Sequence, residues 1–210
     1  MSIIETLGET TVICSDKTGT ITKGEMTVSK IYADNHLIDV TGTGYEGKGD
    51  FISNNKKVNP IKDNVLSLLI KSSVICNDAR IERTGEDNLY NIRGTPTESS
   101  LLIMAVKAGL HIEDLSFKRV EEMPFDSKRK MMSVLCKIEK ENYVFSKGAP
   151  EIVLKNCRKI QKNDGAFTLT EREKRRILEL NKELASNSLR TLAIAYKKVT
   201  SFSKDHFEEE

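Results

Sequence analysis

Two apolar runs joined by a very short polar link most constrain the fold of this chain. Residues 131–138 and 142–146 each have the apolar character of a strand, and the turn between them includes K-E-N at 140–142. A link this short indicates a hairpin, in which the two strands run antiparallel. Because 116–125 also reads as a strand, the sequence predicts an antiparallel sheet in this half of the chain.

Two stretches ahead of these strands carry helical signals. From residue 61 to residue 75, apolar side chains recur at near-helical spacing. A second helix is expected from Pro96, with Thr95 as its N-cap and with Glu98 in the position that completes a capping box. Gly109 is a natural stop for this helix.

Further elements are expected on both sides of this region. Thr170 and Glu173 form a second capping box that opens a charged helix, and 189–196 reads as a buried strand. Near the start, 26–32 alternates apolar and polar residues, and 36–41 is a candidate partner strand. The pattern beyond residue 30 is therefore that of an α+β fold built on an antiparallel sheet.

The first 30 residues carry a different pattern. A β-branched run at 11–15 stops at polar residues, which suits a buried strand that delivers Asp16 to its carboxyl end. Ligand chemistry in α/β sheets usually lies at that end. Asp-Lys-Thr-Gly is also ordinary turn chemistry, so both readings stay open on these residues alone. The change of pattern predicts a domain boundary near residue 28.

Charge and cysteine content exclude several classes of protein. The 33 basic and 31 acidic side chains leave a net charge of +2, which does not indicate a nucleic-acid or membrane-surface binder. The four cysteines lack C-x-x-C spacing, so we expect reduced thiols in a cytosolic protein and no zinc site. No window approaches the roughly 18 apolar residues of a membrane span, so we expect a soluble chain.

The stretch G-T-G-Y-E-G at 42–47 matches the glycine pattern of dinucleotide-binding loops. That pattern acts through a helix that directly follows the glycines. Residues 48–57 read as a loop instead, so we do not expect a dinucleotide site.

Six short motifs follow one another along the chain. They are S-D-K-T-G-T-I-T at 15–22, C-N-D at 76–78, G-T-P-T-E at 94–98, F-D-S-K-R-K-M-M-S-V at 125–134, K-G-A-P-E at 147–151 and L-R-T-L-A-I-A-Y at 189–196. In this order and at these spacings they resemble the P-type cation-transporting ATPases, especially the calcium-pump-like and sodium-pump-like branch. The resemblance runs from about Glu5 to Tyr196.

The resemblance implies a phosphorylation site at the first motif. Asp16 would be the nucleophile that takes the γ-phosphoryl group of ATP and forms an aspartyl-phosphate. Lys17 would shield charge, and Mg²⁺ would bind the Asp16 carboxylate and the Thr18 carbonyl. Thr20 would hold phosphoryl oxygens.

The resemblance also implies that nine further residues bind the nucleotide. They are Thr97, Glu98, Phe125, Lys130, Lys147, Gly148, Ala149, Arg190 and Leu192. The Phe125 ring would stack on adenine, although a lone Phe is more often a core residue. Glu98 would face the adenine, and this role competes with the capping box at Thr95.

Three basic residues of this set also have a purely structural interpretation. Lys147 alone reads as an exposed lysine at a strand end, Lys130 as part of a solvated charge run, and Arg190 as a sheet-edge charge. The resemblance instead places Lys147 at the mouth of the pocket, with Gly148 leaving room for close backbone approach. It places Lys130 near the phosphates or adenine and Arg190 facing the phosphates. Some relatives carry arginine where this chain has Ser127, which puts phosphate contacts from that position in question.

The resemblance divides the chain into three parts. Residues 1–29 would begin a phosphorylation domain, with a short incomplete α/β piece like that of the haloacid dehalogenases. Residues 30–198 would form a nucleotide-binding domain, an antiparallel sheet flanked by helices, and 199–210 would start the linker back. The family segments T-G-D and G-D-G-x-N-D do not occur in the sequence, so we expect a fragment of a larger pump.

The expected function is ATP binding, with Mg²⁺ as cofactor, in the cytosolic part of a pump that transports a cation, with calcium as the expected ion. We expect the fragment to be monomeric, to bind no nucleic acid and to turn over little ATP by itself. Its partners would be ATP and the rest of the pump. The parent protein would lie in a membrane, with this part on the cytosolic face.

Two alternatives remain. A haloacid-dehalogenase-type phosphatase usually has a second Asp two residues after the nucleophile as acid or base, and this chain has Thr18 there. The second alternative is a module that binds a nucleotide without hydrolysing it, which agrees with the absence of T-G-D and G-D-G-x-N-D from the sequence.

Overall fold

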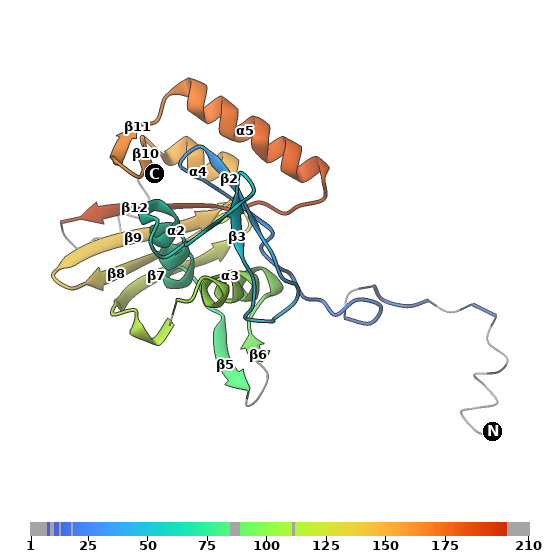
Figure 1. Ribbon diagram of the computed structural model, residues 1–210. Coiled ribbons are helices and arrows are strands. Elements are labelled where there is room, and N and C mark those ends of the chain that lie inside the picture. The colour runs from blue at the N-terminus through green and yellow to red at the C-terminus, as the bar shows by residue number, and fades with distance from the viewer. Residues whose placement is uncertain are drawn as a thin grey trace.

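The computed structural model describes residues 8, 11–12, 14–17, 19–84, 89–110 and 112–200. From residue 30 onward the described chain forms sheets and helices. The described residues up to about 22 extend away from this body (Figure 1), whereas Met26 and Thr27 contact it. Within the described residues, the longest helix has 16 residues, and no helix combines the length and apolar character needed to cross a lipid bilayer.

The main sheet has four antiparallel strands in the order β12-β9-β8-β7. They are β7 (Lys118–Asp126), β8 (Met131–Ile138), β9 (Glu141–Gly148) and β12 (Ala193–Val199). The hairpin predicted from the short polar link is confirmed, because Ile138 pairs with Glu141 and Glu139 has a φ of 54° in the turn.

The strand predicted over 189–196 begins later and ends later than expected. The Leu189 amide donates to the Leu184 carbonyl, and the Thr191 hydroxyl donates to the Asn181 side chain. Residues 189–191 are therefore tied to the end of the preceding helix and cannot join the sheet. The first three residues of β12, 193–195, are half-buried rather than buried.

A second antiparallel sheet contains β1 (Lys30–Ala33), β2 (His36–Val40), β3 (Phe51–Ser53) and β4 (Lys56–Val58) in that order. The strand expected at 36–41 is confirmed, and the one expected at 26–32 begins at Lys30. The expectation that 48–57 is a loop was wrong, because it contains the β3–β4 hairpin. Its turn residues Asn54 and Asn55 have φ of 48° and 61°, and positive φ at both positions is typical of two-residue hairpin loops.

Two smaller hairpins were not predicted. One joins β5 (Arg80–Thr84) to β6 (Leu89–Arg93), and the other joins β10 (Lys159–Lys162) to β11 (Gly165–Thr168). The turn of the second hairpin has the sequence N-D-G, a common hairpin signal.

Helices α2 (Asn64–Ile75), α3 (Pro96–Lys107), α4 (Pro150–Asn156) and α5 (Glu171–Ser186) flank the main sheet (Figure 1). The helix expected from residue 61 begins three residues later, because the Asp63 side chain caps it by accepting from the Leu66 amide. The predicted N-cap of α3 and the capping box of α5 are confirmed. Helix α4 and the 3₁₀ turn η1 (Ile112–Asp114) were not predicted.

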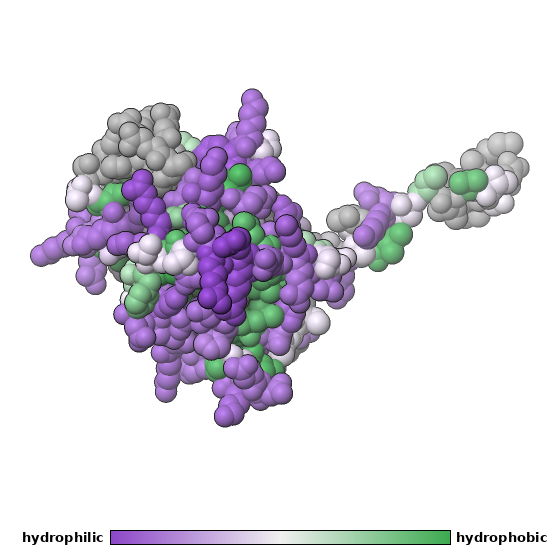
Figure 2. All heavy atoms as spheres, turned by 90° about the horizontal axis from the view of Figure 1, so that it is seen from above, coloured by the Kyte–Doolittle hydropathy of each residue, from purple (hydrophilic) through white to green (hydrophobic). Residues whose placement is uncertain are grey.

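The core lies between the helices and the sheets. Its largest cluster packs the inner sides of α2 and α3 against the β1–β4 sheet, with Leu66, Ile70 and Leu102 almost fully buried beside Phe51. By contrast, α5 has no buried residue. The face seen from above in Figure 2 is accordingly covered mostly by hydrophilic side chains, as expected for a charged helix with a solvated face.

The fold is therefore α+β, with antiparallel sheets flanked by helices as predicted. The strand expected at 11–15 is not formed by residues 11, 12, 14 and 15, which are exposed, whereas residue 13 lies outside the described residues. A buried parallel strand needs neighbouring strands, and no described strand pairs with this run.

Candidate functional site

The segment around Asp16 forms a tight turn on the exposed N-terminal extension. The amides of Ile21 and Thr22 donate to the Lys17 carbonyl at 3.2 and 3.0 Å, and Gly19 has a φ of 81°. Asp16, Lys17 and Thr20 are all exposed. The turn chemistry of Asp-Lys-Thr-Gly is thus present and leaves Asp16 accessible. Thr18, a proposed Mg²⁺ ligand, lies outside the described residues.

Glu98 and Lys147 form an ion pair in the body of the fold. The Lys147 Nζ lies 3.1 Å from Glu98 Oε1, and the two side chains are only 6% and 15% exposed. Lys147 is near the end of β9 and Glu98 is in the first turn of α3. The plain reading of Lys147 as an exposed strand-end lysine is therefore wrong.

The backbone amide and the carboxylate of Glu98 have different sets of partners. The Glu98 amide donates to Thr95 Oγ1 at 3.3 Å and so caps α3. Its carboxylate accepts from Lys147 Nζ, from the Asp78 amide at 3.2 Å and from the Thr95 hydroxyl at 3.4 Å. The carboxylate is thus turned toward Lys147, and only the amide-to-hydroxyl half of a capping box is made.

Gly148 is required by a close approach between β8 and β9. A Cβ on Gly148 would lie 2.5 Å from the Lys130 carbonyl oxygen and 2.9 Å from Met131 Cα, which no side chain tolerates. The Ala149 amide donates to the same Lys130 carbonyl at 2.9 Å. Lys130, Gly148 and Ala149 are therefore neighbours beside Lys147.

Phe125 lies on the surface near the end of β7, with 59% of its area exposed, so its reading as a core residue is wrong. The turn that follows is fixed by Asp126, whose carboxylate accepts from the Lys128 and Arg129 amides at 2.7 and 2.9 Å. These two hydrogen bonds, the Arg129 one first, lower the pKa of the Asp126 carboxyl group. The bulge between Met123 and Asp126 sets this end of β7.

The start of β12 meets the same end of the sheet, because Ala193 pairs with Gly148. Leu192, half-buried, packs against the main core, and Arg190 is exposed. Thr97 is half-buried in the first turn of α3, where its hydroxyl donates to Met26 Sδ at 3.5 Å. Antiparallel order thus collects the end of β7, the start of β8, the end of β9 and the start of β12 at one edge.

Arg119, Asn77 and Asp78 had no individual role assigned from the sequence. Arg119 of β7 contacts Asn77 and Asp78 of the C-N-D motif, which in turn contact Glu98. Cys76 lies beside them, and burial raises the pKa of its thiol to about 12, so it stays protonated. The motif itself was the signal for Asn77 and Asp78, whereas nothing in the sequence pointed to Arg119.

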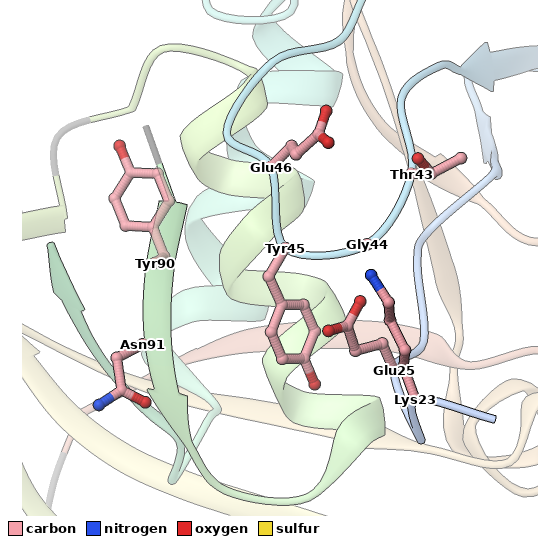
Figure 3. A pocket seen from close by; sticks show the side chains of 8 residues that line it. All are labelled: Lys23, Glu25, Thr43, Gly44, Tyr45, Glu46, Tyr90 and Asn91. Atoms are coloured by element: carbon pink, nitrogen blue, oxygen red, sulfur yellow. The ribbon is translucent and has the colours of Figure 1, made fainter. Parts of the chain in front are cut away.

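A surface hollow among the described residues lies elsewhere. It has a volume of about 470 Å³ and is lined by Lys23, Glu25, Thr43, Gly44, Tyr45, Glu46, Tyr90 and Asn91 (Figure 3). None of the expected nucleotide residues lines it. It includes part of the glycine stretch 42–47, which is a loop followed by β3 and not by a helix.

The glycines of this loop serve packing. Gly44 has a φ of 56°, and a Cβ there would lie 2.7 Å from Glu25 Oε2. A Cβ on Gly47 would lie 2.5 Å from the Tyr90 ring. The buried Lys107 holds the loop by donating to the Thr41 and Gly42 carbonyls, both at 3.0 Å. We therefore do not assign the nucleotide to this hollow, because close contacts with neighbouring residues explain why glycine is needed at these positions.

Comparison with known proteins gives one consistent family. Residues 65–210 match the family model described as P-type ATPase, cytoplasmic domain N. The chain is 34% identical over 209 residues to a calcium-transporting ATPase of Bacillus subtilis, covering 98% of this chain and 23% of that protein. It is 36% identical over 200 residues to human calcium-transporting ATPase type 2C member 1, covering 93% and 21%. The chain thus spans about a fifth of the length of these curated relatives.

Proposed function

This chain belongs to the P-type cation-transporting ATPase family, and from that premise we propose that it binds ATP at the edge of its main sheet. The nucleotide would enter between the end of β7, the end of β9 and the first turn of α3. The chain would be the nucleotide-binding part of a pump, and calcium is the proposed ion, because both relatives are calcium-transporting ATPases.

The observation that carries this proposal is the ion pair of buried Lys147 with half-buried Glu98, at the end of the main sheet where the exposed Phe125 also lies. Burying two charges costs free energy that their mutual attraction often fails to return, so such a pair is weak evidence for stability. A large exposed aromatic side chain is likewise unhelpful to folding. They bring an aromatic ring, one cation and one anion to the same end of the main sheet, a combination that suits the base and the phosphates of a nucleotide.

Each proposed contact uses the chemistry of its side chain. Phe125 stacks on the adenine ring, and Glu98 accepts from its exocyclic amine. Lys147 lies at the mouth of the pocket, Lys130 lies near the phosphates or the adenine, and Arg190 faces the phosphates. The backbone at Gly148 and Ala149 allows a close approach, and Thr97 and Leu192 complete the walls.

Asp16 is the proposed phosphoryl acceptor. A carboxylate oxygen attacks the γ-phosphorus, the bond to the β,γ-bridging oxygen breaks, and ADP leaves with that electron pair. Lys17 shields the charge of the two approaching anions, and Thr20 donates to phosphoryl oxygens.

The exposed Asp16 carboxylate suits Mg²⁺, which proteins usually bind through one or two carboxylates together with substrate phosphates. The Asp16 carboxylate and the Thr18 carbonyl are the proposed ligands. When bound, the ion neutralises phosphate charge.

Residues 1–29 are proposed as the start of the phosphorylation domain, 30–198 as the nucleotide-binding domain and 199–210 as the start of a linker. In this proposal the body lies on the cytosolic face of the membrane, where ATP is. The chain alone would bind ATP as a monomer without useful turnover, because the family segments T-G-D and G-D-G-x-N-D are not in its sequence. The rest of the pump would be its partner.

Titration calorimetry with ATP tests this function. Phe125→Ala and Lys147→Ala should each weaken binding by roughly tenfold or more, since base–aromatic stacking and charged hydrogen bonds are each worth about 1–3 kcal/mol. Phe167→Ala and Lys155→Ala are matched controls, because both side chains are exposed and lie on β11 and α4. If both site variants bind ATP as tightly as the unaltered chain, the site assignment is wrong.

A further inference from the structure

We propose that Arg119 is a positioning residue that fixes Glu98 for recognition of the adenine base, acting through the Asn77–Asp78 segment. This inference rests on the proposed ATP site. Arg119 is not itself one of the residues that we propose to contact the nucleotide. Its effect is carried by a chain of contacts that runs from β7 to the segment after α2 and from there to α3.

A β-bulge turns Arg119 toward the site. Residues three apart on a regular strand point to opposite faces, but the register of β7 shifts between Arg119 and Glu121. With Val120 as the extra residue, Arg119 and Glu122 lie on the same face, and Arg119 Nη1 is 3.2 Å from Glu122 Oε2. Bulges are common next to active sites, where they re-aim side chains.

The same face carries Lys147. Arg119 pairs with Cys136 and Glu122 with Val134 on β8, and Met132, two residues from Val134, pairs with Lys147. Because side chains alternate with a period of two, these positions share one face of the sheet.

Arg119 grips two consecutive residues of the C-N-D motif. Its Nη1 donates to Asp78 Oδ1 at 2.9 Å and its Nη2 donates to the Asn77 carbonyl at 3.1 Å. The planar guanidinium presents two N–H groups in a fixed fork, which a lysine ammonium cannot reproduce. The segment that follows α2 is therefore held against β7 by both a side chain and a backbone group.

That segment in turn holds Glu98. The Asp78 amide donates to Glu98 Oε1 at 3.2 Å, and Asn77 Nδ2 donates to the Glu98 carbonyl at 3.0 Å. Gly94 lets the segment come close, since a Cβ on Gly94 would lie 2.5 Å from Ala79 Cβ.

As a result, the two oxygens of the Glu98 carboxylate have different hydrogen-bond partners. Glu98 Oε1 accepts from both Asp78 and Lys147, whereas the hydrogen bond of Oε2 within the described part of the chain is the long 3.4 Å contact with the Thr95 hydroxyl. Oε2 is therefore the atom left to accept from a base amine. Without Arg119 the Asp78 amide is no longer held in place, and the carboxylate can rotate. Base discrimination then falls more than phosphate binding.

The test compares ATP and GTP binding by calorimetry for Arg119→Ala and Asp78→Asn. Each variant should bind ATP roughly five- to tenfold more weakly, the size of one lost hydrogen bond. GTP binding should weaken less, so the ATP/GTP affinity ratio falls. The double variant should add little to either single change, because both break the same contact. Arg119→Lys should recover only part of the ratio.

Lys118→Ala is the matched control. It removes one positive charge from the adjacent position of β7, where Lys118 is exposed and pairs with Lys137 on β8. The control should leave the ATP/GTP ratio unchanged. Because the Arg119 pairs are partly exposed, the melting temperature of Arg119→Ala should fall by less than about 4 °C.

The possible outcomes distinguish a failure of the positioning role of Arg119 from a failure of the proposed ATP binding. If the unaltered chain binds ATP and Arg119→Ala and Asp78→Asn bind it equally well, the positioning role is refuted and the ATP site stands. Equal losses for ATP and GTP would also refute it, since they would show a general loss of structure. An unaltered chain that binds neither nucleotide overturns the proposed function and this inference together.

Discussion

The segment around Asp16 and the sheet edge around Lys147 are built in different ways. The turn at Asp16 closes over residues 17–22 by hydrogen bonds to one carbonyl. The contacts of Glu98 reach Asp78, 20 residues earlier, and Lys147, 49 residues later. The first is local structure on an exposed extension, and the second is a product of tertiary packing. A motif can therefore be unmistakable in the sequence while its geometry is not determined by the fold around it.

Hydrogen exchange gives the largest expected contrast between the two regions. Amides of residues 14–17 and 19–22 should exchange roughly a thousandfold or more faster than those of β8, because exchange from buried core strands requires global unfolding. Amide exchange monitored by mass spectrometry measures this. Equal protection in the two regions would mean that the Asp16 segment is anchored as firmly as the sheet.

Core and extension should also differ in their response to truncation. Leu135→Ala should lower the free energy of unfolding by about 2–5 kcal/mol, since Leu135 is fully buried. Ile21→Ala should change it by less than about 0.5 kcal/mol, because Ile21 is 70% exposed. Urea unfolding of both variants makes the comparison, which a large loss at Ile21 would contradict.

The capping box of α5 predicts a smaller, pH-dependent effect within the body. Hydrogen bonds from Lys162 first, and then from Thr170, lower the pKa of the Glu173 carboxyl group to about 2. Its stabilising contribution is fully present above the usual pKa of 4.5 and is lost as the pH falls toward 2. Glu173→Gln should therefore reduce stability at pH 7 and have little effect near pH 2.

Denaturant unfolding of Glu173→Gln across this range measures the difference from the unaltered chain. Glu179→Gln is the control, because that side chain is exposed on the same helix. A loss of stability that is the same at pH 7 and pH 2 would show that the bonds do not depend on ionisation.

Asp16→Asn should have the smallest effect. It should leave ATP affinity unchanged, because the proposed base and phosphate contacts come from the sheet edge. ATP labelled at the γ-phosphate should give no stable incorporation with either form. Stable labelling that depends on Asp16 would show that the chain alone is catalytically complete.

Much of the fold was predictable where the signal is local. The hairpin of β8 and β9 followed from the short polar link between two apolar runs, and the starts of α3 and α5 followed from capping residues. The β3–β4 hairpin was missed although Asn54 and Asn55 carry a turn signal, because its strands have only three residues each. The start of β12 was misplaced because hydrogen bonds to α5, which no pattern reveals, hold residues 189–191.

The site was predictable only as a set of motifs. Short motifs pointed to Phe125, Lys147 and Glu98, but composition could not tell that the first is exposed, the second buried and the third half-buried. Arg119 was invisible, because its direction depends on a register shift that becomes defined only when β7 pairs with β8. Residues that act through bulges need the partner strand before they can be recognised.

The edge where β7, β8, β9 and β12 meet has a thermodynamic consequence. Its strands come from segments as far apart as residues 126 and 193, so a ligand held there joins parts of the chain that separate on unfolding. Binding to the folded state alone adds about 2.7 kcal/mol of stability at a ligand concentration one hundred times the dissociation constant. With ATP bound there as proposed, the melting temperature of this chain would be a direct gauge of how much of that edge is occupied.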